Sequence, residues 1–117
     1  MVSFDSGNSI LNTVKQMLGS TEDYDAFDMD IIVHINSGFG RLCELGVGPE
    51  TPFHIESEET TWSEFDTAVP MYQIIRFMFL YVKRIFDPSA NSVIMQAYKE
   101  EQDKLEWLMC SVADVGY

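Results

Sequence analysis

The chain has 117 residues, a net charge of −12, and 46% hydrophobic and 13% aromatic residues. This length and composition predict one globular domain over residues 1–117 that needs neither a metal nor a disulfide to fold. The acidity argues against direct binding to DNA or RNA, because a negative surface repels phosphate.

Apolar residues recurring every three or four positions, together with end signals, predict an all-α fold. We expect a small helical bundle of about four helices, at about residues 8–18, 28–45, 71–87 and 92–113. Side chains suited to cap the first, second and last of these helices are Asn8 or Ser9, Asp25 or Asp28, and Asn91 or Ser92. Gly38 and Gly40 interrupt the second helix, which indicates a kink, a close approach by another backbone, or simple sequence drift.

One long acidic loop is predicted at residues 47–68. The alternation in "FHIE" and the β-prone "TTW" are compatible with a short β-hairpin turning at residues 57–59, and "SEF" is compatible with a helical turn. Loops of this length in small domains are often functional or mobile. The loop concentrates five acidic residues: Glu56, Glu58, Glu59, Glu64 and Asp66.

The segment at residues 71–87 is strongly apolar, but it is not expected to span a membrane. Pro70 and Pro88 limit its length, and Arg76 lies within it. On a helical wheel its polar stripe is narrow and contains Gln73, Arg76, Leu80, Lys83 and Arg84. A surface helix normally has a wider polar face. This helix must therefore be nearly surrounded, either by its own domain or by a neighbouring subunit.

The sequence shows no recognisable catalytic or ligand-binding motif. His34 and His54 have no second nitrogen or sulfur ligand at metal spacing, and no serine or cysteine nucleophile has a local signature. Cys43 and Cys110 are expected to be thiols of a reducing cytosol rather than a disulfide. We therefore expect a protein that is not an enzyme and that has no metal or cofactor.

Four stretches carry a family resemblance and together cover most of the chain. They are "ILNTVKQMLG" at 10–19, "DMDIIVHINSGFGRLCELGVGP" at 28–49, "TTWSEF" at 60–65 and "YVKRIFDPSANSVIMQAYKEEQDKLEWLM" at 81–109. The most specific piece is "FDP" followed by a capped amphipathic helix that ends in "LEW". In this order the stretches resemble the head–tail connector (head-completion or adaptor) proteins of long-tailed double-stranded DNA bacteriophages.

The resemblance implies a helical bundle with an extended loop and a structural role in the virion. Such proteins dock as a ring, usually twelve-fold, beneath the portal protein after the genome is packaged. They extend the DNA channel and present a platform to the next connector or tail-completion protein. The implied location is the head–tail junction, after assembly in the host bacterial cytoplasm, with DNA passing through without specific binding and no membrane involved.

An uneven charge distribution suggests where such a protein makes contacts. Residues 1–70 contain 13 acidic and 2 basic residues, hence −11, whereas residues 71–117 contain 6 and 5, hence −1. A basic stripe on the third helix that meets an acidic neighbour is one hypothesis, and pairing of these bases within their own chain is the alternative. The candidate subunit or portal interface consists of Arg76, Leu80, Lys83, Arg84 and Trp107. The acidic loop residues are candidates for lining the channel or meeting a partner.

Two other classes of function remain open at this point. A small acidic helical regulator that mimics DNA is the main alternative, but the nearly neutral, apolar last 47 residues argue against it. A simple dimeric helical scaffold is the other. Binding tests with heparin, DNA and a nuclease would separate a DNA mimic from a connector.

Overall fold

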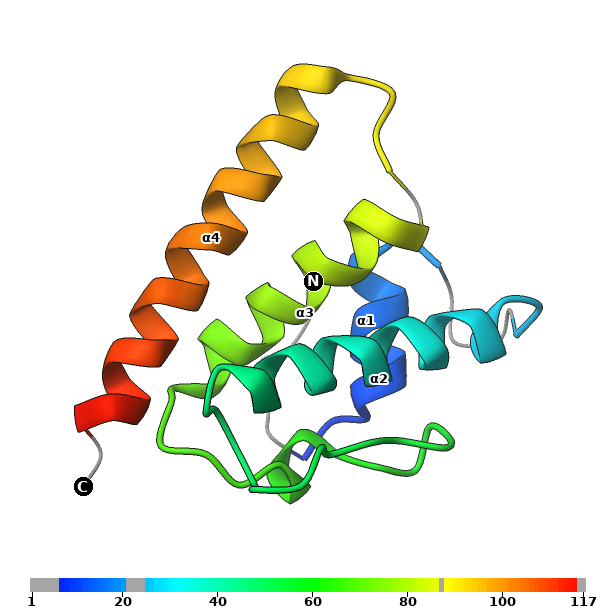
Figure 1. Ribbon diagram of the computed structural model, residues 1–117. Coiled ribbons are helices and arrows are strands. Elements are labelled where there is room, and N and C mark those ends of the chain that lie inside the picture. The colour runs from blue at the N-terminus through cyan, green and yellow to red at the C-terminus, as the bar shows by residue number, and fades with distance from the viewer. Residues whose placement is uncertain (1–6, 21–24, 87, 116–117) are drawn as a thin grey trace.

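The computed structural model describes residues 7–20, 25–86 and 88–115 and confirms the all-α bundle (Figure 1). Its elements, in chain order, are α1 (Ile10–Met17), α2 (Asp28–Glu44), the short 3₁₀ helix η1 (Trp62–Glu64), α3 (Met71–Phe86) and α4 (Ser92–Val115). The predicted end of the third helix at residue 87, and the link at residues 21–24, lie outside the described residues.

Helix α3 lies at the centre of the bundle, because it packs against α1, α2 and α4 (Figure 1). The other three helices and the loop before α3 supply the rest of the core around it. Its own domain therefore surrounds the most apolar helix. No helix among the described residues is both long and apolar enough to cross a membrane. The fully or nearly buried residues of α3 are Ile74, Ile75, Phe77, Met78, Phe79, Leu80 and Val82.

Side-chain caps begin two of the helices, as their sequences predict. The Ser9 hydroxyl accepts a hydrogen bond from the Asn12 amide at 3.2 Å at the start of α1. The Asn91 carboxamide oxygen accepts hydrogen bonds from the amides of Val93 and Ile94 at 2.9 and 3.2 Å at the start of α4. These bonds satisfy amides that have no partner within the first turn of a helix.

The start of α2 differs from the prediction that Asp25 or Asp28 caps it. Phe27 occupies the N-cap position without a side-chain hydrogen bond, and the Asp28 carboxylate instead lies 2.9 Å from the Lys15 ammonium on α1. Lys15 is only 1% exposed. A buried ammonium needs a nearby opposite charge, so the pairing of Asp28 with α1 takes precedence over capping.

The β-hairpin anticipated around residues 57–59 is absent, since residues 51–60 contain no strand. The backbone groups of Ile55, which a strand partner would have satisfied, bond instead to the side chain of Asn36 on α2, at 2.7 Å for the amide and 3.0 Å for the carbonyl. Further along, Thr61 forms an isolated antiparallel bridge with Ser9. The loop thus pairs with α1 and α2 rather than with itself.

The loop is anchored by its own apolar side chains. Ile55 and Trp62 are almost completely buried, and the Trp62 indole N–H donates to the Thr13 hydroxyl on α1 at 3.1 Å. The rings of Phe53 and Phe65 pack on Phe39 of α2, with centroid separations of 4.9 and 5.0 Å. A long loop whose own side chains are packed in this way is a compact part of the domain. The acidic residues between these anchors therefore have fixed positions relative to the helices.

The glycines of α2 have different roles. A Cβ at Gly38 would lie 2.6 Å from the Met78 sulfur of α3, whereas a Cβ at Gly40 would meet nothing within 4 Å. Gly38 therefore permits the close approach of α2 and α3, and Gly40 faces open space. In the loop, Gly48 has a φ of +91°, and a Cβ there would lie 2.5 Å from the Phe65 ring. Both its backbone conformation and its packing favour glycine.

Candidate functional site

The two histidines do not come together in the described structure. His34 is half-buried and packs edge-on to Phe86, with ring centroids 6.1 Å apart, while His54 is exposed in the loop. Among the residues that the structure describes, no group of three or more His, Cys, Asp or Glu side chains could hold a metal ion. The candidate functional features are therefore sought on the surface of the molecule.

The polar stripe of α3 faces α4 of the same chain. The Arg76 guanidinium forms two hydrogen bonds to the Glu101 carboxylate, and Arg84 donates to the Gln102 carboxamide oxygen at 2.7 Å. Leu80, between them on the stripe, is fully buried. These contacts correspond to the alternative in which the bases pair within their own chain. Lys83, another member of the stripe, is half-buried.

A third arginine, on α2, contacts α4 a little further along the helix. Arg41 on α2 donates to both carboxylate oxygens of Glu106, at 2.8 and 3.4 Å, and to Glu44 at 3.2 Å. Gln102 also donates to Glu106, at 3.1 Å. The sequence did not predict this contact. The available signal was the presence of the polar residues Gln102 and Glu106 on the inward side of an amphipathic helix.

These hydrogen bonds change the ionisation of the groups involved. Hydrogen bonds from Arg76 lower the pKa of Glu101, and the same bonds raise the pKa of Arg76. Burial alone would raise the pKa of Glu106, but the hydrogen bonds from Arg41 and Gln102 outweigh it and lower the pKa. Both carboxylates thus stay charged at a pH at which an ordinary glutamate starts to be protonated, so the two arginine contacts to α4 persist in mildly acidic solution.

The acidic loop residues are all exposed, but they form two groups. Glu56, Glu59 and Glu64 line one open hollow of about 430 Å³ together with His54. The Glu64 carboxylate also accepts a hydrogen bond from the Thr61 amide at 2.8 Å, which fixes it at the start of η1. Glu58 is also exposed, but it does not line this hollow.

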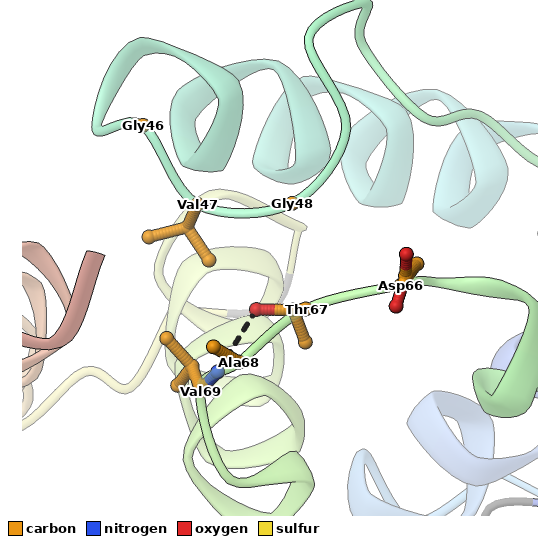
Figure 2. A pocket seen from close by; sticks show the side chains of 7 residues that line it. All are labelled: Gly46, Val47, Gly48, Asp66, Thr67, Ala68 and Val69. Atoms are coloured by element: carbon orange, nitrogen blue, oxygen red, sulfur yellow. Dashed lines mark hydrogen bonds between the residues drawn. The ribbon is translucent and has the colours of Figure 1, made fainter. Parts of the chain in front are cut away.

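Asp66 lies apart, at a second hollow of about 240 Å³ between the turn after α2 and the segment before α3. Figure 2 shows Val47 and Gly48 on one side and Asp66 to Val69 on the other, with a hydrogen bond of 3.1 Å from the Val69 amide to the Thr67 hydroxyl. Asp66 is its one ionisable lining residue, so this hollow has no cluster of groups suited to chemistry.

Large apolar side chains are exposed on α2, α3 and α4, and those on α3 are Tyr72 and Ile85, at 60% and 50%. Trp107 of α4, expected from its place off the inner stripe to make contacts, is 67% exposed. Val93 on the same helix, and Met29 and Val33 on α2, are also more than half exposed. The exposure of Val93, Met29 and Val33 was not predicted from the sequence. Exposed apolar residues that gather on one face commonly mark sites of protein interaction.

Comparison with known proteins assigns the family. The family model described as phage connector protein matches residues 10–115. The match spans nearly the whole chain, so the protein belongs to the phage connector protein family, whose members are structural proteins of head–tail junctions. It is accordingly a structural protein of the virion that interacts with other phage head or tail proteins. No curated protein and no solved structure gives a significant match.

Proposed function

We propose that this protein joins the phage head, at the portal protein, to the tail. In this role several copies form a ring beneath the portal after packaging, extend the DNA channel and present a platform to the next connector or tail-completion protein. The observation that carries the proposal is the family match over residues 10–115. The ring follows the twelve-fold symmetry usual for portals, and its subunits assemble in the host bacterial cytoplasm.

The decisive experiment is co-sedimentation of the purified protein with portal rings of the same phage, with the bound copies counted. We expect saturable binding at one copy per portal subunit. The protein alone, and the protein with portal rings of an unrelated phage, are the controls and should stay in the supernatant. Absence of binding, with both proteins folded, would overturn the assignment to the portal.

The acidic loop has a role of its own in this proposal. Glu56, Glu58 and Glu59 are exposed, and the loop that carries them is anchored at Ile55 and Trp62. Carboxylates facing the channel repel the phosphates of DNA, whereas basic residues would bind them and hold the genome. We infer that the loop faces the channel and lets DNA slide during ejection.

Changing Glu56, Glu58 and Glu59 together to glutamine tests this role. We expect slower release of DNA from the assembled particles, or more DNA retained, because the repulsive surface is lost. The matched control changes three exposed acids outside the loop, with Asp25→Asn, Glu44→Gln and Asp103→Asn. Release at the wild-type rate in both variants would mean that the loop faces the portal or a tail partner instead.

A further inference from the structure

The outer face of α4 forms a ridge that nothing in the described structure covers. Val93 and Trp107 are 76% and 67% exposed, and helical spacing aligns them with Ala97, Glu100 and Lys104. Lys104 lies between the two large apolar residues and has no ion-pair partner among the described residues. We call Val93, Lys104 and Trp107 the α4 ridge.

The outer face of α2 also has exposed apolar residues, here beside a carboxylate. Met29 and Val33 are 73% and 57% exposed, and they lie one helical turn apart on the side away from the buried face of α2. Asp30 lies beside both and, like Lys104, has no ion-pair partner in the described parts of the chain. We call Met29, Asp30 and Val33 the α2 ridge.

The two ridges are unlike and lie far apart. In Figure 1, α4 forms one edge of the molecule, and the start of α2 at Asp28 lies at the opposite edge. A contact between two different surfaces of identical chains is heterologous, and it propagates from copy to copy rather than stopping at a dimer. In such a contact every subunit binds one neighbour through its α4 ridge and another neighbour through its α2 ridge.

We propose that the α4 ridge of one copy packs against the α2 ridge of the next, with Lys104 facing Asp30. Tryptophan and methionine are enriched in protein interfaces, and the two unpaired opposite charges set the register and exclude the wrong pairing. For its biological role the inference rests on the proposed ring, since it names the contact between neighbouring subunits. The contact itself is measurable without a portal.

Charge reversal in the full chain provides the test, with self-association measured by sedimentation velocity. We expect the wild type to form a concentration-dependent series of species beyond the dimer. The Lys104→Glu substitution alone places two carboxylates opposite each other in the contact, and the Asp30→Lys substitution alone places two ammonium groups opposite each other. Each variant should therefore associate at least about tenfold more weakly than the wild type, because like charges face each other.

Mixing the two variants supplies the matched control. Every contact between a Lys104→Glu chain and an Asp30→Lys chain again joins opposite charges, so the equimolar mixture should recover the association of the wild type. Recovery also shows that both variants are folded. A wild type that is still monomeric at about 1 mM would overturn the inference, and so would a mixture as weak as its components. If Lys104→Glu loses self-association while Asp30→Lys associates like the wild type, the contact is a symmetric α4–α4 dimer. That result would also overturn the inference.

These outcomes are distinct from failure of the proposed function. Portal binding of the wild type is measured separately, and it can succeed whether or not copies associate through these ridges. If portal binding fails while the mixture recovers association, the self-contact stands and the portal role does not.

Discussion

Replacing Trp62 with alanine is expected to destabilise the protein by about 3–5 kcal/mol, as for other large aromatic residues removed from a core. Trp62 is fully buried. Its indole N–H donates to Thr13 at 3.1 Å, and its backbone amide donates to the Asn8 carbonyl at 3.2 Å. The residue thus joins the long loop to α1, and its removal leaves a cavity at that junction. Urea unfolding followed by circular dichroism measures the change in the free energy of unfolding.

The second tryptophan is the matched control for this experiment. Trp107 is 67% exposed on α4, so Trp107→Ala should change the free energy of unfolding by less than about 0.5 kcal/mol. The two substitutions remove the same atoms from one chain, and only the surroundings differ. An effect of Trp62→Ala below about 1 kcal/mol would contradict the loop being part of the core, because full burial of a side chain this large has a greater effect.

The helices of this fold could be predicted from the sequence because their signals are local. The apolar stripe of α2 and the caps Ser9 and Asn91 each involve residues within a few positions of one another, and local periodicity captures such patterns. The extreme hydrophobicity of α3 likewise indicated a surrounded helix. Local patterns do not show which neighbours surround it, because that depends on residues distant in the chain.

The loop and the polar contacts could not be predicted, because they depend on long-range partners. Asn36 and Ile55 are 19 residues apart, and Arg41 and Glu106 are 65 apart. Nothing in the residues near Asn36 shows that its carboxamide will replace a strand partner. Periodicity places Arg76 and Arg84 on one face of α3, but it does not show whether α4 or a second subunit covers that face.

Replacing Asn36 with alanine is expected to destabilise the protein by about 2–4 kcal/mol. The carboxamide of Asn36 bonds to both the amide and the carbonyl of Ile55, at 2.7 and 3.0 Å, and Ile55 is almost completely buried. Alanine leaves a donor and an acceptor without partners, and each unsatisfied buried group has an unfavourable effect of about 1–3 kcal/mol. Ser37→Ala, at the exposed next position, is the control and should stay within about 0.5 kcal/mol of the wild type.

The Asn36→Ala substitution should release the acidic loop before it unfolds the bundle. Glu56 follows Ile55 directly, so the position of the acidic hollow depends on this pair of hydrogen bonds. A glutamate-specific protease should therefore cleave Asn36→Ala after Glu56, Glu58 or Glu59 faster than it cleaves the wild type or Ser37→Ala, because local opening of the segment becomes more frequent. Equal cleavage rates in all three proteins would mean that Trp62 and the phenylalanine cluster alone hold the loop. DNA release from particles that carry Asn36→Ala can be measured in parallel. If cleavage is faster and DNA release is slower, the passage of DNA depends on the position of the loop carboxylates as well as on their charge.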